Sequence, residues 1–175
     1  MWQRRHYKDR SHERMNNGPG LRVTLFVSGC DHYCNGCQNP ETWDTKSGIP
    51  FDNTAIEEIF KQLDNDYISG ITFSGGDPLN ANNRVEVCSL IHQIRLKYGK
   101  SKSIWIYTGY TWEEIVNTLT PVLLGVDVLI DGMFDKDLAD VNYHWAGSTN
   151  QRVIDVQRSL EEKKVILYKD NIGND

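Results

Sequence analysis

Apolar residues along the chain form short uninterrupted runs, separated by stripes of helical spacing. The runs are typical of strands buried on both faces, and they lie at residues 23–27, 68–73, 104–107 and 126–130. The stripes predict helices at residues 56–63 and 84–98. Strands that alternate with helices are joined by right-handed crossovers, so the sequence predicts an α/β fold with a parallel sheet.

Polar residues mark two helix starts. Thr54 with Glu57, and Thr111 with Glu114, have the spacing of a capping box, in which side chains and backbone N–H groups exchange hydrogen bonds. The second pair predicts a short helix that carries Trp112. Later in the chain the pattern weakens, and it predicts two short strands around a helical turn, at residues 153–156, 165–168 and 159–163.

A chain of 175 residues is long enough for one compact domain. We therefore expect a single domain over residues 1–175, with an N-terminal extension at residues 1–16 and a C-terminal tail at residues 153–175. The extension holds the one basic stretch, which acidic residues interrupt and which predicts a solvated face: Arg4, Arg5, Lys8, Arg10 and Arg14, with Asp9 and Glu13.

Each predicted strand ends in small or polar residues. These endings are Gly29-Cys30, Gly75-Gly76-Asp77, Thr108-Gly109 and Asp131-Gly132. Ligands of parallel sheets bind beyond the carboxyl ends of the strands. The four segments are therefore expected to face one common site.

Charge and hydropathy narrow the functional classes. A net charge of -5 gives no reason to expect nucleic acid as a partner. No apolar run is long enough to span a membrane, and the N-terminus lacks the apolar core of a secretory signal. We expect a cytoplasmic protein, and in a reducing compartment clustered cysteines indicate metal or redox chemistry rather than disulfides.

Three cysteines, Cys30, Cys34 and Cys37, lie in one short loop after the first strand. Such a loop can direct three thiolates at one inorganic core, and a four-iron cluster held by three thiolates keeps one iron open for a chelating ligand. A zinc site is the alternative, with His32 as a candidate fourth ligand, and three unrelated cysteines are another. Cys88 lies near the apolar stripe of the second helix and is expected to be an inert core thiol.

The segment Gly75-Gly76-Asp77-Pro78 follows one predicted strand and precedes a helix. Residues without side chains let a ligand approach the backbone closely, here the amino group of a bound amino acid. An ordinary tight turn is the alternative reading of this segment alone. A cysteine loop at the end of the preceding strand favours the ligand.

These residues resemble the radical S-adenosylmethionine superfamily, whose hallmark is a cysteine loop of this spacing after the first barrel strand. Further segments resemble the activating component of the anaerobic class III ribonucleotide reductase: 17–20, 25–30, 74–79, 105–110, 131–132 and 147–152. Two positions depart from that pattern, because Gln38 replaces a usual tyrosine and Ala146 a common arginine. The resemblance implies an α/β fold that is a partial, open TIM-like barrel of parallel strands with outer helices.

The resemblance also implies an enzyme. A 4Fe-4S cluster would reductively cleave S-adenosylmethionine to a 5′-deoxyadenosyl radical, which takes a hydrogen from a backbone glycine of the large reductase subunit. The implied partners are that subunit and a small flavoprotein electron donor, with no nucleic acid and no membrane. The alternatives are an activase of another glycyl-radical enzyme, a small radical enzyme acting on a metabolite, and a non-catalytic zinc-binding module.

The same resemblance assigns site residues. The cluster ligands would be Cys30, Cys34 and Cys37. Residues lining the cofactor would be Gly36, Cys37 and Gln38, with Gly75, Gly76 and Asp77 at its methionine part. Thr108 and Asp131 are added as candidates only because they lie at strand ends, not from the resemblance. No acid–base residue is required. The aromatic residues are expected to be core or partner contacts: Trp105, Tyr107, Tyr110 and Trp112.

Overall fold

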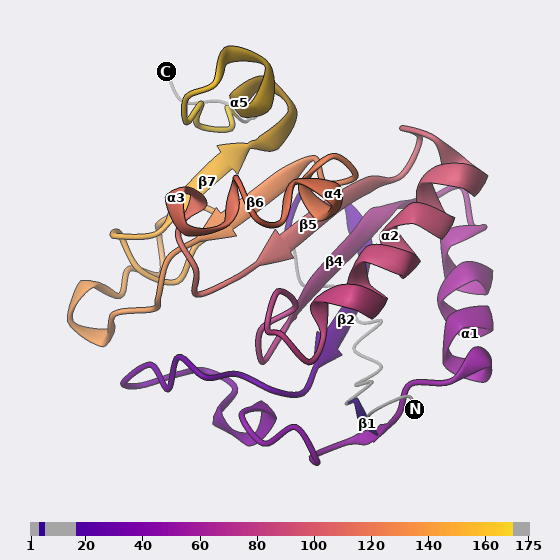
Figure 1. Ribbon diagram of the computed structural model, residues 1–175, viewed down its shortest axis with the longest axis horizontal. Helices are drawn as coiled ribbons and strands as arrows, with labels where there is room; N and C mark the ends of the chain where they lie inside the picture. Colours follow the sequence, from indigo (N-terminus) through magenta and orange to yellow (C-terminus); the bar gives the residue numbers. More distant parts are fainter. Residues whose placement is uncertain (1–3, 6–16, 170–175) are drawn as a thin grey trace.

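A five-stranded sheet forms the centre of the computed structural model, which describes residues 4–5 and 17–169 (Figure 1). Its strands, in spatial order, are β2 (Leu21–Val27), β4 (Ile68–Gly75), β5 (Ser103–Tyr107), β6 (Val128–Asp131) and β7 (Arg152–Asp155). Neighbours are parallel from β2 to β6, and β7 is antiparallel to β6. The predicted α/β fold with a mostly parallel sheet is confirmed. The sheet is open, and its likeness to a partial barrel stays a prediction.

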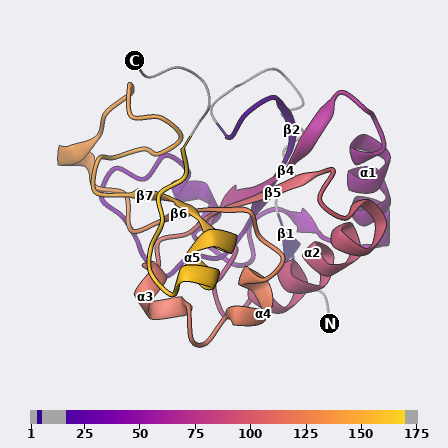
Figure 2. The same cartoon turned by 90° about the horizontal axis from the view of Figure 1, so that it is seen from above.

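Helices lie between these strands in the chain: α1 (Asn53–Leu63), α2 (Arg84–Tyr98), α3 (Trp112–Ile115) and α4 (Thr120–Leu123). A further helix, α5 (Val156–Glu162), follows β7. Figure 2 shows α2, α4 and α5 on the same side of the sheet. The loops also contain a small antiparallel pair and two 3-10 helices: β1 (Arg4–Arg5) with β3 (Ile49–Pro50), η1 (Pro40–Thr42) and η2 (Lys136–Leu138).

Side-chain alternation along the strands builds a core on each face of the sheet. On the helix-covered face, Leu25 and Phe73 are at most 1% exposed and join one cluster with buried residues of α1 and α2. On the other face, the Trp105 ring packs edge-on against Trp145 and Tyr168, with centroid distances of 5.6 and 5.3 Å. Trp105 is therefore a core residue, which is one of the two roles predicted for it.

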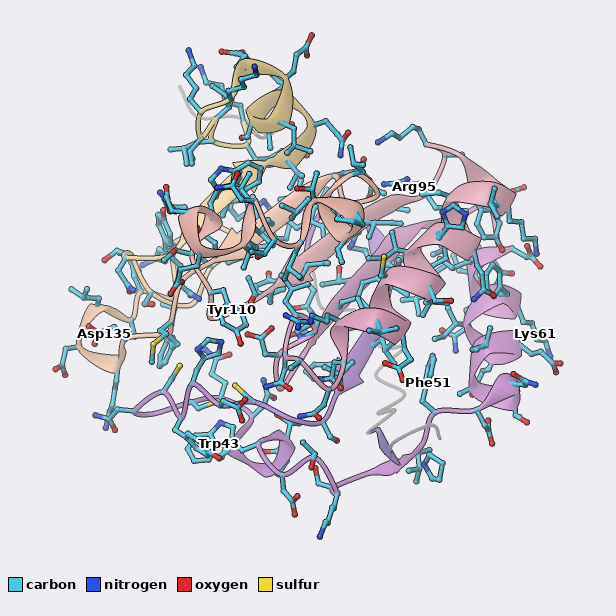
Figure 3. The ribbon with its side chains drawn as sticks, in the orientation of Figure 1. Trp43, Phe51, Lys61, Arg95, Tyr110 and Asp135 are labelled. Atoms are coloured by element: carbon cyan, nitrogen blue, oxygen red, sulfur yellow. The ribbon has the colours of Figure 1, made fainter. Side chains whose placement is uncertain are left out.

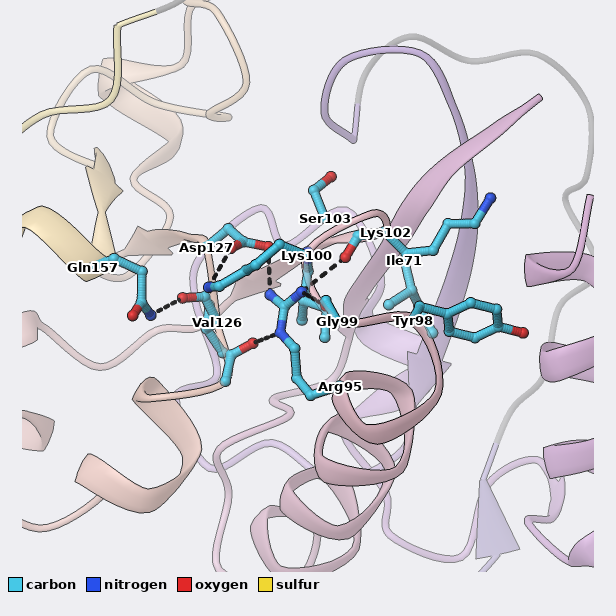
Figure 4. Close-up of polar contacts among 12 residues, drawn as sticks. Ile71, Arg95, Tyr98, Gly99, Lys100, Lys102, Ser103, Val126, Asp127 and Gln157 are labelled. Carbon is cyan, nitrogen blue, oxygen red and sulfur yellow. Dashed lines mark hydrogen bonds and ion pairs between the residues drawn. The ribbon is translucent and has the colours of Figure 1, made fainter. Parts of the chain in front are cut away.

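Arg95, near the end of α2, fastens the amino-terminal edge of the sheet (Figure 4). Its guanidinium forms an ion pair with Asp127. It also donates to the carbonyl oxygens of Gly125, at 2.8 Å, and Lys102, at 2.9 Å. Asp127 accepts from the N–H of Ile104 in β5, at 2.7 Å. This network joins α2, β5 and β6 at the edge opposite to the carboxyl ends of the strands.

One of the two predicted capping boxes is confirmed and the other is wrong. The Glu114 carboxylate accepts from the N–H of Thr111 at 2.7 Å, as expected. Helix α1 instead begins before Thr54, because the Asp52 carboxylate caps it by accepting from the N–H of Ala55 at 3.1 Å.

The C-terminal elements differ in part from the prediction. The strand expected at residues 153–156 corresponds to β7, and the helical turn corresponds to α5, which begins earlier because the Asp155 carboxylate accepts from the N–H of Arg158 at 3.1 Å. The strand expected at residues 165–168 is wrong, because that segment forms only an isolated bridge between Leu167 and Ile154.

Part of the N-terminal prediction falls outside the described residues. Arg4 and Arg5 form β1, whereas Lys8, Arg10 and Arg14 lie in the part that the structure does not describe. Among the helices of the described part, none is both long enough and apolar enough to cross a membrane.

Candidate functional site

The cysteine loop leaves β2 at the carboxyl edge of the sheet, level with the end of β4, where Val27 pairs with Gly75. Backbone hydrogen bonds fasten the start of the loop to the segments beside it. The N–H of Cys30 donates to the carbonyl of Trp43 at 3.2 Å, and the N–H of Asp77 donates to the carbonyl of Gly29 at 2.8 Å. In Figure 3 the loop runs between Trp43 and Tyr110.

The three cysteines of the loop are free thiols that differ in burial. Cys30 is buried at 8% exposure, and Cys34 and Cys37 are half-buried. Burial raises the pKa of the Cys30 thiol to about 11, and it also raises the pKa of Cys34. Without a metal the protein therefore holds both as neutral thiols, and binding of a metal would release their protons.

Backbone N–H groups act on all three cysteine sulfurs. The N–H of Asn39 donates to Sγ of Cys37 at 3.4 Å. The N–H groups of His32 and Tyr33 lower the pKa of Cys30, and that of Phe134 lowers the pKa of Cys34, against the larger effect of burial. Hydrogen bonds of this kind favour the thiolate form, and in iron–sulfur proteins they set the reduction potential. The donor set therefore fits a thiolate-bound cluster.

The spacing of possible metal ligands bears on the kind of site. Among residues 4–5 and 17–169, no three His, Cys, Asp or Glu side chains lie close enough together to bind a single metal ion. The thiolates of an iron–sulfur cluster each bind a different iron, so they are spread around a larger core.

His32, weighed above as a zinc ligand, has another partner. Its Nε2 lies 2.7 Å from Oδ2 of Asp77, and this hydrogen bond raises the pKa of His32. Its ring also packs edge-on against Tyr110, with centroids 4.6 Å apart. The contact joins residues 45 positions apart. No feature of the sequence pattern indicated it.

Asp77 and Thr108, which were predicted at two separate strand ends, lie in direct contact. The Asp77 side chain is 1% exposed, and its oxygens accept from the Thr108 hydroxyl at 2.9 and 3.0 Å. They also accept from the N–H groups of Leu79, at 2.7 Å, and Gly109, at 3.0 Å. With His32 as a further donor, the hydrogen-bonding capacity of this carboxylate is filled.

Close packing within the protein requires both glycines of the pair. A Cβ on Gly75, whose φ is +100°, would lie 2.7 Å from backbone atoms of Val27. A Cβ on Gly76 would lie 2.6 Å from the carbonyl oxygen of Gly29 and 2.9 Å from that of Thr42. The pair therefore lets the end of β4 approach the cysteine loop, whatever it binds.

The second half of the cysteine loop touches the segment after β6, which sequence reasoning missed. Gly36 has a φ of +74°, and a Cβ there would lie 2.9 Å from Cδ of Lys136. Gln38, predicted to line the cofactor, is exposed. Because Lys136 packs against Gly36 and the Phe134 N–H lowers the pKa of Cys34, the segment after β6 adjoins the cysteine loop. In the sequence, only the polar strand ending Asp131-Gly132 indicated that the segment after β6 lies near the cysteine loop.

Asp131 connects three elements at the end of β6. It is 1% exposed and accepts from the N–H of Trp112 at 2.7 Å and from Nε of Arg152 at 3.0 Å. Arg152 also pairs with Glu113. The Asp131 carboxylate oxygens are therefore engaged by α3 and β7 rather than by the cysteine loop. Ala146, the second departure from the family pattern, packs against the Trp105 cluster.

Comparison with protein families adds an independent finding. The sequence model of a family described as "4Fe-4S single cluster domain" matches residues 16–154. The matched segment contains the whole cysteine loop and all the strand ends that form the edge described above.

Individual relatives are similar over the same part of the chain. An anaerobic ribonucleoside-triphosphate reductase-activating protein of Escherichia coli K12 is 43% identical over 139 residues, which cover 78% of this chain and 90% of the relative. Proteins of the same name from Enterobacteria phage T4 and Vibrio cholerae are 42% and 40% identical over 137 residues each. Those two alignments cover 78% and 77% of this chain and 85% and 88% of the relatives.

Proposed function

The chain belongs to the family of anaerobic ribonucleoside-triphosphate reductase-activating proteins, and we propose that it generates a glycyl radical on the large subunit of that reductase. One observation of the structure carries the proposal. Three free thiols lie on one short loop at the carboxyl edge of a mostly parallel sheet, where a backbone N–H donates to Cys37 and backbone N–H groups oppose the raised pKa of Cys30 and Cys34.

Cys30, Cys34 and Cys37 would hold a 4Fe-4S cluster with one iron free of protein ligands. When bound, the cluster and S-adenosylmethionine supply one-electron cleavage of the sulfonium and removal of a hydrogen from the target glycine. The protein's own residues bind and orient these groups and exclude water from the reacting atoms. The buried Cys30 side of the loop faces the protein interior, while Cys34 and Cys37 lie nearer to solvent.

The cofactor would lie along the edge formed by the strand ends. We assign Gly36, Cys37 and Gln38 to its rim and the turn Gly75-Gly76-Asp77 to its methionine part, with Thr108 and Asp131 at the neighbouring strand ends. Support comes from the contact between Thr108 and Asp77, which shows that two of these strand ends meet. The sheet would be the open half of a partial barrel around this cofactor, within a single domain.

The first experiment is anaerobic reconstitution with iron and sulfide. We expect about four irons per chain, and dithionite should then convert S-adenosylmethionine to methionine and 5′-deoxyadenosine. Single Cys30→Ala, Cys34→Ala and Cys37→Ala variants should lose this cleavage. Cys88→Ala is the matched control and should keep it, because Cys88 lies on α2 beside the helix-side core. A fully loaded protein that leaves S-adenosylmethionine intact would contradict the proposal, as would zinc without iron after anaerobic purification.

The second experiment identifies the target. The reconstituted protein is mixed with the large reductase subunit, and electron paramagnetic resonance should show a glycyl radical on that subunit. A signal on another glycyl-radical enzyme, or turnover of a free metabolite, would redirect the assignment within the same chemistry. A small flavoprotein should replace dithionite as electron donor in a cytoplasmic setting.

A further inference from the structure

One side chain of the cysteine loop reaches the ends of β4 and β5 without being a candidate cluster ligand. His32 lies between Cys30 and Cys34, and its Nε2 contacts the Asp77 carboxylate at the end of β4 at 2.7 Å. Its ring also packs against Gly109 after β5, because a Cβ on that glycine would be 2.4 Å from the imidazole Cδ2. The imidazole therefore fills the space between the loop and two strand ends.

Asp77 is a rigid anchor for this contact. The carboxylate is 1% exposed and already accepts hydrogen bonds from backbone N–H groups of Leu79 and Gly109 and from the Thr108 hydroxyl. A buried carboxylate held by several donors keeps one orientation, and a hydrogen bond to a charged group is stronger than one between neutral groups. A second side-chain contact, from Asn80 to Asp31 at 2.7 Å, lies beside it, but Asp31 is exposed to water.

We propose that His32 is a positioning residue that binds Asp77 and thereby holds the cysteine loop in the geometry that receives the cluster. The inference rests on the proposed function and deepens it. It also assigns the Asp77 carboxylate to the loop.

His32→Phe tests the proposal because phenylalanine keeps a ring against Tyr110 but removes the nitrogen that contacts Asp77. The full-length protein is reconstituted anaerobically, and loss of iron to a chelator is followed with time. We expect the variant to lose its cluster at least about tenfold faster than the wild type, the factor given by one hydrogen bond to a charged group. His32→Gln should recover most of this loss, because its side-chain amide can donate to Asp77.

A matched control separates positioning from general stability. Arg95→Gln breaks a partly buried ion pair at the opposite edge of the sheet, and it should lower the melting temperature without changing the rate of cluster loss. If cluster loss in Arg95→Gln and His32→Phe follows the melting temperature alike, the role of His32 is merely structural and the proposal is wrong.

A second readout needs no cluster. In the cluster-free full-length protein, alkylation of each cysteine is followed by mass spectrometry. Cys30 is 8% exposed in the wild type and should react slowly. His32→Phe should raise its rate at least about tenfold relative to Cys88, which serves as an internal reference. An unchanged Cys30 rate, or equal rises at both cysteines, overturns the proposal. A wild-type protein that fails to take up iron would instead contradict the proposed function. The alkylation measurement would still test whether the contact of His32 with Asp77 positions the loop.

Discussion

Arg152 at the start of β7 donates from Nε to Oδ1 of Asp131, at the end of β6, across 3.0 Å. The same carboxylate accepts from the N–H of Trp112 at the start of α3, at 2.7 Å. Because Asp131 is 1% exposed, removal of either partner leaves a buried polar group unsatisfied. The pair therefore holds the antiparallel edge strand and a helix on the parallel part of the sheet.

Asp131→Asn should lower the free energy of unfolding by about 2 kcal/mol. This loss is smaller than that from breaking a fully buried ion pair, because Arg152 is one-third exposed. The measurement is the midpoint of urea unfolding of the cluster-free protein. Glu113→Gln is the control: its side chain is 61% exposed, so the change should stay within about 0.5 kcal/mol. Equal losses of unfolding free energy in the two variants would show that the burial of Asp131 does not determine the loss.

Gly76→Ala should disrupt the join between β4 and the cysteine loop. The added Cβ would overlap the backbone carbonyl oxygens of Gly29 and Thr42, at 2.6 and 2.9 Å, and no rotamer change relieves contacts with backbone. We expect a loss of about 3 kcal/mol in the free energy of unfolding. Iron uptake of the folded fraction should also fall, because the start of the loop must shift. A variant with wild-type stability and iron content would contradict this packing.

Gly36→Ala tests the contact between the loop and the segment after β6. It combines backbone strain, from a φ of +74°, with a clash against the side chain of Lys136. Gly99→Ala is a matched control, since Gly99 has a φ of +57° but no atom within 4 Å of the added Cβ. The control should lose about 1 kcal/mol of stability, and Gly36→Ala should lose more. Added to Gly36→Ala, Lys136→Ala should reduce only the part of the stability loss that exceeds the loss in Gly99→Ala. The iron content of the variants should follow the same order as their stability.

Much of the fold could be predicted from the sequence because its elements have strong local signals. The strands at residues 23–27 and 104–107 are uninterrupted apolar runs, and α2 is a long helical stripe. The start of α1 was mistaken because Asp52 and Thr54 are both good caps, and only tertiary packing selects between them. The apolar run at residues 165–168 lies beside β7, but it pairs with β7 only through the bridge of Leu167 with Ile154, and the apolar pattern does not encode where pairing stops.

Residue spacing and strand order were enough to predict which segments form the candidate site. The cysteine loop and the turn at Gly75 follow strands, so a parallel sheet places them at one edge. The contact of His32 with Asp77, and that of Lys136 with Gly36, join segments far apart in the chain. Such pairs depend on side-chain orientation within the packed structure, which neither residue spacing nor hydrophobic periodicity encodes.

Tyr107 links the sheet to the loop that carries Trp145, and its burial predicts a response to alkaline pH. Its hydroxyl donates to the carbonyl oxygen of Trp145 at 2.6 Å, and burial raises the pKa of Tyr107 above its ordinary value, with the Arg22 cation opposing this shift. The folded state therefore keeps the phenol protonated after the unfolded chain has begun to lose the proton. Its stabilising effect is complete below about pH 10 and falls as the pH rises further.

Tyr107→Phe removes both the hydrogen bond and this titration. At pH 8 the variant should be less stable than the wild type by about 1 kcal/mol, because the Trp145 carbonyl loses a donor. Between pH 9 and pH 11 the wild type should lose about 1 kcal/mol more than the variant, so that their unfolding free energies converge. Urea unfolding of both proteins at matched pH values measures the difference and cancels the titration of groups that they share. A difference that stays constant across this range would show that the Tyr107 phenol ionises equally easily in the folded and unfolded chains.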